Sequence, residues 1–226
     1  LADLPALVKV PAGQNVLILA PHFDDETIGC GGTIRKHILE GNRVSVAYIT
    51  DGREGIPDLK DKKKVTEIRK GEAQKAMEIL GVRDIYYLNE IDMAERMKEE
   101  TVHELRKVID GIRPDLIYLP WFLDNHVDHV KTNKLLRQVH RESNRNFNVC
   151  AYEVWTPMVQ NIMVDISETI ELKKKALSCF ESQLKQVDYL STTLGLNRYR
   201  SCYMHGGRSF VEAFLHMKAQ EYFSLF

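Results

Sequence analysis

The hydrophobic positions of this chain form short continuous runs that alternate with longer amphipathic stretches. Apolar runs of strand length predict strands at residues 15–20, 44–50, 84–88 and 116–120. Between these runs, apolar positions with a helical period predict helices over residues 27–40, 60–80 and 95–112. Strands that alternate with helices of this length are typical of an α/β fold with a mostly parallel sheet.

The last third of the chain has a weaker pattern. It predicts a helix to about residue 142, a strand at 148–154, a helix at 168–184 and a late strand at 209–217, while residues 190–207 are ambiguous. The chain has 226 residues and shows no repeat or linker, so we expect a single domain spanning residues 1–226. This length is sufficient for a full sheet with helices on both faces.

The charge and cysteine content narrow the possible partners and compartment. The 31 basic and 32 acidic residues leave a net charge of −1, which gives no electrostatic reason to expect nucleic acid as a partner. The four cysteines lie far apart without a C-x-x-C pair, so a reducing compartment is expected. No apolar run reaches the roughly 18 residues that span a bilayer, and the first residues lack a signal-peptide pattern. We therefore expect a cytoplasmic protein without a transmembrane segment.

Two clusters of acids and histidines follow strand ends. Residues 22–26 (His-Phe-Asp-Asp-Glu) come directly after the first predicted strand, and residues 126–129 (His-Val-Asp-His) follow the fourth. Ligands of open parallel sheets bind beyond the carboxyl ends of the strands, so both clusters should lie at that edge. Neighbouring carboxylates repel one another unless a cation compensates their charge. The sequence therefore predicts a divalent-metal site at the mouth of the sheet.

The spacing of the clusters suits the ligand set of a catalytic metal. Such a zinc site takes three protein ligands and leaves one position for water. His22 and Asp25 can supply two ligands, which leaves Asp24 free to point elsewhere. Either His126 or His129 can supply the third ligand, while the other histidine acts on the substrate. Each cluster alone could be a capped helix start, but two such accidents at one sheet edge are improbable.

These motifs resemble those of the PIG-L/LmbE family of zinc-dependent N-acetylglucosaminyl deacetylases. The similarity rests on Ala-Pro-His-Phe-Asp-Asp-Glu at residues 20–26, the glycine-rich helix start after it, and His-Val-Asp-His at residues 126–129. Thr-Asp-Gly at residues 50–52 and the Arg69-x-x-Glu72 motif also match. The resemblance extends over about residues 15–142, and Phe23 replaces the usual proline without removing a ligand. It implies a Rossmann-like fold and removal of acetyl from an N-acetylglucosamine-type conjugate.

The resemblance also assigns roles to the clustered residues. It implies that Zn²⁺, or another divalent first-row metal, has three ligands: His22, Asp25 and His129. Asp24 would be the general base that activates water. His126 would polarise the tetrahedral intermediate or protonate the leaving amine, and Asp128 would orient a histidine.

The expected partner is a small-molecule amino-sugar conjugate. Four side chains are expected to bind it: Arg53, Arg69, Asp92 and Trp121. Taken alone, Arg69 and Glu72 would be an ordinary surface ion pair, but the resemblance implies that this arginine reaches the sugar or its attached group. Trp121, like Trp155, follows a strand end, where an indole ring can stack on a sugar, although buried core packing is commoner.

Two other functions stay open at this point. One is an amidase that acts on another acyl amide or on a thiol conjugate. The other is a catalytically inactive nucleotide- or sugar-binding module, because the glycines of residues 29–32 superficially suggest a phosphate-binding turn. Their spacing is not G-x-G-x-x-G, and the preceding carboxylates would repel a pyrophosphate. The sequence specifies neither the group attached to the amino sugar nor the oligomeric state.

Overall fold

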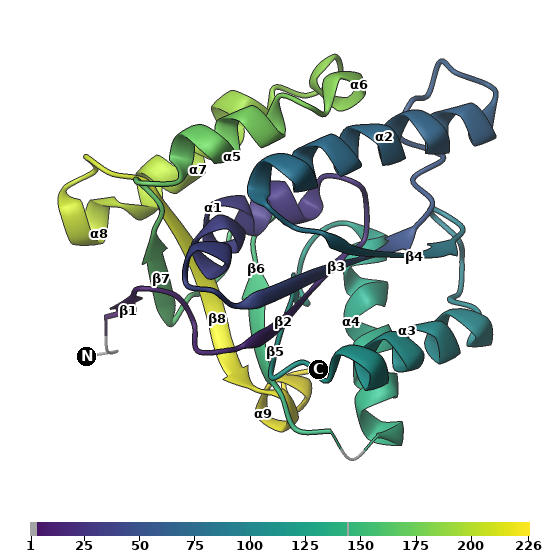
Figure 1. Cartoon of the computed structure of the whole chain (residues 1–226), viewed down its shortest axis with the longest axis horizontal. Helices are drawn as coiled ribbons and strands as arrows, with labels where there is room; N and C mark the ends of the chain where they lie inside the picture. Colours follow the sequence, from purple (N-terminus) through teal and green to yellow (C-terminus); the bar gives the residue numbers. More distant parts are fainter. Residues whose placement is uncertain (1–3, 144) are drawn as a thin grey trace.

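The computed structural model describes residues 4–143 and 145–226, and these residues form one continuous eight-stranded sheet (Figure 1). The strand order is β1-β7-β8-β6-β5-β2-β3-β4. Neighbouring strands are parallel, except that β8 is antiparallel to both β6 and β7. The strands are β1 (Ala6–Val8), β2 (Asn15–Ala20), β3 (Arg43–Thr50), β4 (Asp84–Glu90), β5 (Leu116–Pro120), β6 (Asn148–Tyr152), β7 (Ile162–Asp165) and β8 (Val211–Lys218).

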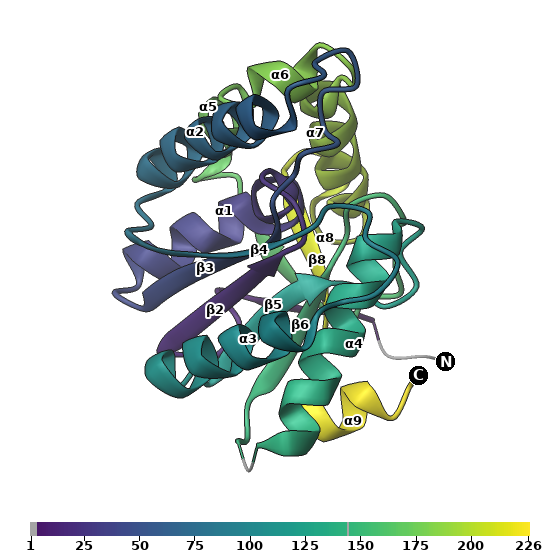
Figure 2. The same cartoon turned by 90° about the vertical axis from the view of Figure 1, so that its right-hand side faces the viewer.

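Helices cover both faces of this sheet. Figure 2 shows α1, α2 and α5 to α7 on one side, and α3, α4 and α9 on the other. The helices of the described residues are α1 (Asp25–Leu39), α2 (Lys62–Leu80), α3 (Glu99–Ile112), α4 (Val127–Glu142), α5 (Ile170–Leu177), α6 (Glu181–Leu184), α7 (Tyr189–Arg200), α8 (Cys202–His205) and α9 (Ala219–Phe223). None of them is long and apolar enough to cross a membrane.

The predicted α/β architecture is confirmed. One predicted helix of the last third is wrong, and two short strands are additional to the prediction. The single helix predicted at residues 168–184 is wrong, because the chain leaves helical geometry at Phe180 (ψ 54°), whose side chain is buried in the core. The short strands β1 and β7, of 3 and 4 residues, were not predicted. They are too short to show the alternation by which a strand is recognised in a sequence.

The topology brings the two acid/histidine clusters together. Strand β2 lies between β3 and β5, because the chain winds from β2 outward to β4 and then returns to place β5 on the other side. This reversal is a topological switch point, where open α/β sheets form their binding crevice. Residues 22–26 follow β2 and residues 126–129 follow β5, so both clusters lie at this crevice.

Glycines let the start of α1 lie against the sheet. The helix is interrupted at Cys30 (φ −144°). A Cβ atom at Gly29 would lie 2.1 Å from the Tyr152 ring, and one at Gly32 would lie 2.7 Å from Ile166. Only glycine permits so close an approach. The glycines are thus used for packing, which argues against a phosphate-binding turn.

A buried ion pair between two residues of the last third of the chain binds the backbone of α1 on both sides of its interruption at Cys30. Lys173 Nζ lies 2.6 Å from Glu212 Oε1 and donates to the Ile28 carbonyl at 2.8 Å. The Glu212 carboxylate accepts from the backbone N–H groups of Gly32 and Thr33 at 2.9 and 2.7 Å. The cation therefore meets a free helix carbonyl, and the carboxylate meets free N–H groups. This contact anchors the first turn of α1, which carries residues of the first cluster.

His37, on α1, is a buried neutral histidine that belongs to neither cluster. Its Nε2 atom lies 2.8 Å from the Tyr118 hydroxyl, and its Nδ1 atom lies 2.9 Å from the Asn42 amide. Burial lowers the pKa of His37 to about 4, against a smaller opposite effect of nearby acids. The unfolded chain binds this proton at about pH 6.5, so below that pH protonation favours the unfolded state.

We therefore expect acid to destabilise the fold through His37. Its contribution should lower the free energy of unfolding by up to about 1.4 kcal/mol per pH unit as the pH falls from about 6.5 to about 4, and then level off. Urea unfolding of metal-free protein across this range measures the effect. His37→Gln should remove this part of the pH dependence, and the exposed control His103→Gln should keep it. Equal acid sensitivity in both variants would contradict the prediction.

Candidate metal centre

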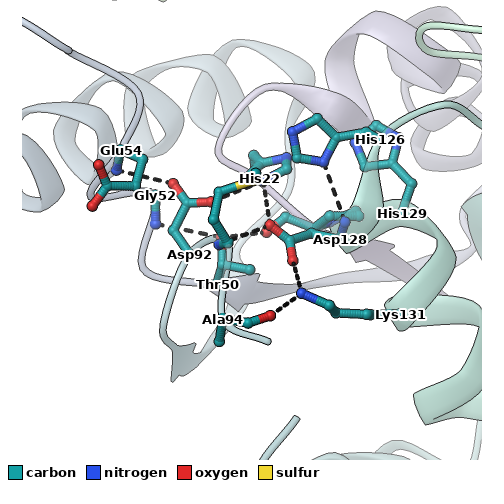
Figure 3. A network of polar contacts seen from close by, with 12 residues as sticks. His22, Thr50, Gly52, Glu54, Asp92, Ala94, His126, Asp128, His129 and Lys131 are labelled. Carbon is teal, nitrogen blue, oxygen red and sulfur yellow. Dashed lines mark hydrogen bonds and ion pairs between the residues drawn. The ribbon is translucent and has the colours of Figure 1, made fainter. Parts of the chain in front are cut away.

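The turn after β2 places His22 among three carboxylates, of which Figure 3 shows Asp92 and Asp128. Its Nδ1 atom lies 3.1 Å from Asp25 Oδ2, and its Nε2 atom lies 3.3 Å from Asp92 Oδ1 and 3.4 Å from Asp128 Oδ2. The His22 backbone N–H also donates to Asp25 Oδ2 at 2.8 Å. Burial alone would lower the pKa of His22, but the three acids together raise it well above its usual value. The surroundings of His22 therefore strongly favour a positive charge.

His129 lies in the first turn of α4 and faces two further carboxylate oxygens. Its Nε2 atom lies 3.3 Å from Asp25 Oδ2, and its Nδ1 atom lies 3.1 Å from Asp124 Oδ1. Neither contact has hydrogen-bond geometry, although the side chain is 0% exposed. Burial would lower the pKa of His129, but Asp25 and Asp124 raise it to about 9. Buried ring nitrogens without a hydrogen-bond partner are unusual and suit a metal ligand.

The donor atoms fit a divalent metal ion. Asp25 Oδ2 lies close to His22 Nδ1 and to His129 Nε2, while the second nitrogen of each ring faces another carboxylate. Metal-binding histidines commonly have this arrangement, because the outer carboxylate fixes the ring and makes it more basic. Two imidazoles and one carboxylate suit a first-row metal with an open coordination position. The structure thus brings together His22, Asp25 and His129, the three residues that the family resemblance names as ligands.

Other ligand combinations converge on the same residue. Ligand atoms lie within 4.8 Å of one another in two groups of described residues: His22 with His126 and His129, and His22 with Asp92 and Asp128. Both groups contain His22, so the described potential ligands surround one centre. Asp124, which the sequence analysis did not select, completes the surroundings of His129. Asp124 lies between β5 and the second cluster, two residues before His126, and this proximity to a histidine was the available signal in the sequence.

His126, the N-cap residue of α4, is held as a neutral hydrogen-bond donor. Its Nδ1 atom accepts from the Asp128 backbone N–H at 3.2 Å, which leaves the ring proton on Nε2. Burial lowers the pKa of His126, and the neighbouring His22 and His129 lower it further. The Asp128 carboxylate accepts from the Met93 backbone N–H at 3.0 Å. Asp128 therefore holds His22 through its side chain and His126 through its backbone.

Asp24 is a buried carboxylate next to this centre, at the start of α1. Burial raises the pKa of Asp24. Arg69, whose Nη2 atom lies 3.4 Å from Asp24 Oδ2, offsets only part of this rise. Arg69 also donates to the Gly52 carbonyl at 3.0 Å and is only 3% exposed. The alternative of a surface ion pair between Arg69 and Glu72 is therefore wrong. Glu72 accepts instead from the Ser182 hydroxyl at 2.7 Å.

A cavity of about 240 Å³ opens onto the centre. The residues that line it are His22, Asp24, Asp25, Glu54, Gly55, Arg69, Asp92, Met93, His126, Trp155, Gln183 and Tyr189. His129 and Asp128 lie beneath this surface, at 0% and 1% exposure. The cavity wall thus combines several expected site residues with side chains from the last third of the chain.

Two of the expected substrate-binding residues lie outside the lining of this cavity. Arg53 donates from Nε to Asp51 Oδ2 at 2.7 Å and lines a neighbouring hollow. Trp121 lies against Phe122 with ring centroids 5.3 Å apart. Trp155, the other tryptophan that follows a strand end, lines the cavity.

Comparisons with known proteins agree with this geometry. The model of the PIG-L family, described as GlcNAc-PI de-N-acetylase, matches residues 17–140. The diacetylchitobiose deacetylase of Thermococcus kodakarensis is 31% identical over 190 residues, which cover 76% of this chain and 71% of that protein. A Bacillus anthracis protein named "Probable N-acetyl-alpha-D-glucosaminyl L-malate deacetylase 2" is 26% identical over 190 residues, 75% of this chain and 81% of its own. The matched segment 17–140 contains both acid/histidine clusters.

A solved structure shares the fold over most of the chain. It is the N,N'-diacetylchitobiose deacetylase from Pyrococcus horikoshii, complexed with its inhibitor MPG. The TM-score is 0.80 at 26% identity, and the match covers 91% of this chain and 84% of that one. The similarity therefore includes the last third, where the sequence pattern is weak.

Proposed function

This chain belongs to the PIG-L family of de-N-acetylases, and from this membership we propose that it is a metal-dependent hydrolase that deacetylates an N-acetylglucosamine conjugate. The observation that carries the proposal is the placement of Asp25 Oδ2, 3.1 Å from His22 Nδ1 and 3.3 Å from His129 Nε2. The two relatives named above are deacetylases of such conjugates by their names.

We propose that Zn²⁺ is the ion held by His22, Asp25 and His129, with one position left for water. When bound, the ion would polarise the acetamide carbonyl and lower the pKa of water to about 7. The same donors suit other first-row divalent ions, so the identity of the metal is part of the test.

Asp24 is proposed to transfer the proton, and His126 is proposed to stabilise the developing negative charge. Asp24 takes one proton from water while the water oxygen bonds to the acetamide carbon. His126, with its ring proton on Nε2, donates a hydrogen bond to the carbonyl oxygen as negative charge develops there. Asp24 then passes its proton to the nitrogen, the C–N bond breaks, and the products are acetic acid and the free amine. The contacts of His126 favour the first of its two expected roles.

Substrate contacts are proposed for the residues that line the cavity. Arg69 and Asp92 both face it, and each is held in place, Arg69 by the Gly52 carbonyl and Asp92 by the Glu54 backbone N–H at 3.0 Å. Fixed polar groups of this kind orient a sugar through its hydroxyl groups. Arg53 lies outside this lining, so we propose no direct substrate contact for it.

The proposed function predicts metal-dependent acetate release. Metal-loaded protein should release acetate from at least one of three conjugates: diacetylchitobiose, N-acetylglucosaminyl malate and the N-acetylglucosaminyl inositol. Chelation should abolish turnover, and Zn²⁺ should restore it together with about one metal per chain. Mg²⁺ is the matched control, because its preference for octahedral oxygen ligands should prevent restoration.

Two results would change this proposal. Turnover that survives complete removal of metal would contradict it. Release of an acid only from another acyl amide would support the amidase alternative, and bound metal without any turnover would support an inactive binding module.

A further inference from the structure

A second cavity of about 200 Å³ adjoins the first, and the two share Trp155 and Tyr189 as walls. Trp155 follows β6, and Tyr189 begins α7, so the shared wall comes from two separate segments. The two rings meet edge to face, with centroids 6.0 Å apart and an interplanar angle of 67°. Trp155 is nevertheless 47% exposed. An exposed indole that lines two adjoining cavities is a suitable contact surface for a ring-shaped ligand.

The second cavity is mostly apolar, with a few hydroxyl groups. Its apolar lining residues are Ile28, Val154, Val187, Leu196 and Ala213. Thr192 and Thr193 contribute hydroxyl groups from α7. A sugar ring has apolar C–H faces and polar hydroxyl edges, so an aromatic and aliphatic lining with a few hydroxyls suits it.

The charges around both cavities disfavour an anionic ligand. Glu153, the one charged residue in the lining of the second cavity, is paired with Arg200, whose Nε lies 3.2 Å from Glu153 Oε2. Arg69, the one Arg or Lys in the lining of the first cavity, is paired with Asp24. Lys173, which contacts Asn197 behind the second cavity, is 0% exposed and paired with Glu212. The described lining residues of the two cavities include no unpaired Arg or Lys. A carboxylate or phosphate bound there would therefore lose its hydration without gaining a cation as a partner.

We propose that the second cavity binds the group attached to the amino sugar, and that this group is an uncharged sugar ring stacked on Trp155. The inference rests on the proposed function, because it places the acetamide of the first sugar over the metal centre. Trp155 and Tyr189 then determine specificity, since they separate the ring that reacts from the ring that is only bound. A conjugate with a carboxylate in this position would be a poor ligand.

Calorimetry on the metal-loaded Asp24→Asn protein tests this inference without turnover. Diacetylchitobiose should bind at least about tenfold more tightly than N-acetylglucosamine or N-acetylglucosaminyl malate. Adding Trp155→Ala should remove this preference, because the disaccharide then loses more affinity than N-acetylglucosamine does. Tyr199→Ala is the matched control, because this aromatic residue of α7 is 60% exposed and lines neither cavity.

A second variant tests the cavity itself with the indole intact. Thr192→Trp should fill the cavity from the side of α7 and weaken only the disaccharide, also by about tenfold. Equal affinity for the monosaccharide and the disaccharide, or tighter binding of the malate conjugate, would overturn the inference. Tryptophan-dependent disaccharide binding, with no acetate release by the metal-loaded wild-type protein, would overturn the proposed function alone and keep the sugar site in the second cavity.

Discussion

Asp24→Asn is expected to lower kcat for acetate release by about 10²–10⁴-fold while the metal content stays at the wild-type level. Asparagine has nearly the same shape as aspartate but cannot accept the proton of the attacking water. Asp24 is not among the three proposed ligands, and its carboxylate faces Arg69, which keeps its bond to the Gly52 carbonyl in the variant. Steady-state acetate release and metal analysis of the same samples measure both quantities.

Two further substitutions give this result its meaning. Asp25→Asn should lose both metal and activity, because Asp25 Oδ2 lies near the proposed ligand atoms of both histidines. Asp58→Asn, at an exposed acid of the loop after β3, should change neither. An Asp24→Asn enzyme with wild-type kcat would show that another group takes the proton, and one without metal would make Asp24 a ligand.

The parts of the site that could be predicted lie in two short stretches of the sequence, each directly after a strand or close to its end. His22 and Asp25 share one turn after β2, and His129 follows β5, so two strand ends were enough to bring them together. The burial of Arg69 required the family motif, because an arginine three residues before a glutamate is ordinarily a surface pair. Asp124 contacts His129 from a loop that has no periodic pattern, and its position two residues before His126 was the one signal in the sequence.

The contacts that could not be predicted are tertiary contacts between distant segments. Trp155 and Tyr189 become neighbours only because the loop after β6 meets the start of α7. The ambiguous stretch at residues 190–207 proved to be largely helical, and its first helix carries one wall of the second cavity. If the second cavity binds the attached group as proposed, substrate choice lies in the part of the chain whose sequence pattern is weakest.

Lys173→Met is expected to lower the free energy of unfolding by about 3–5 kcal/mol. Lys173 is one of three consecutive lysines, and the sequence does not distinguish it from its neighbours. In the structure its ammonium group bonds the Ile28 carbonyl, Asn197 and Glu212, and both charges are 0% exposed. Methionine keeps the length of the side chain but leaves the Glu212 carboxylate buried without its cation, which costs far more than the loss of a surface pair.

Chemical denaturation of metal-free protein measures this cost, with the exposed neighbour Lys175→Met as the matched control, for which we expect a change within about 0.5 kcal/mol. Adding Glu212→Gln to Lys173→Met should recover part of the lost stability, because it removes the unpaired charge. Equal stability of the two lysine variants would mean that the Lys173–Glu212 ion pair does not stabilise the interrupted helix α1. Since the first turn of α1 carries Asp25, the Lys173→Met protein should also bind metal more weakly than the Lys175→Met protein, which links the last third of the chain to the metal centre.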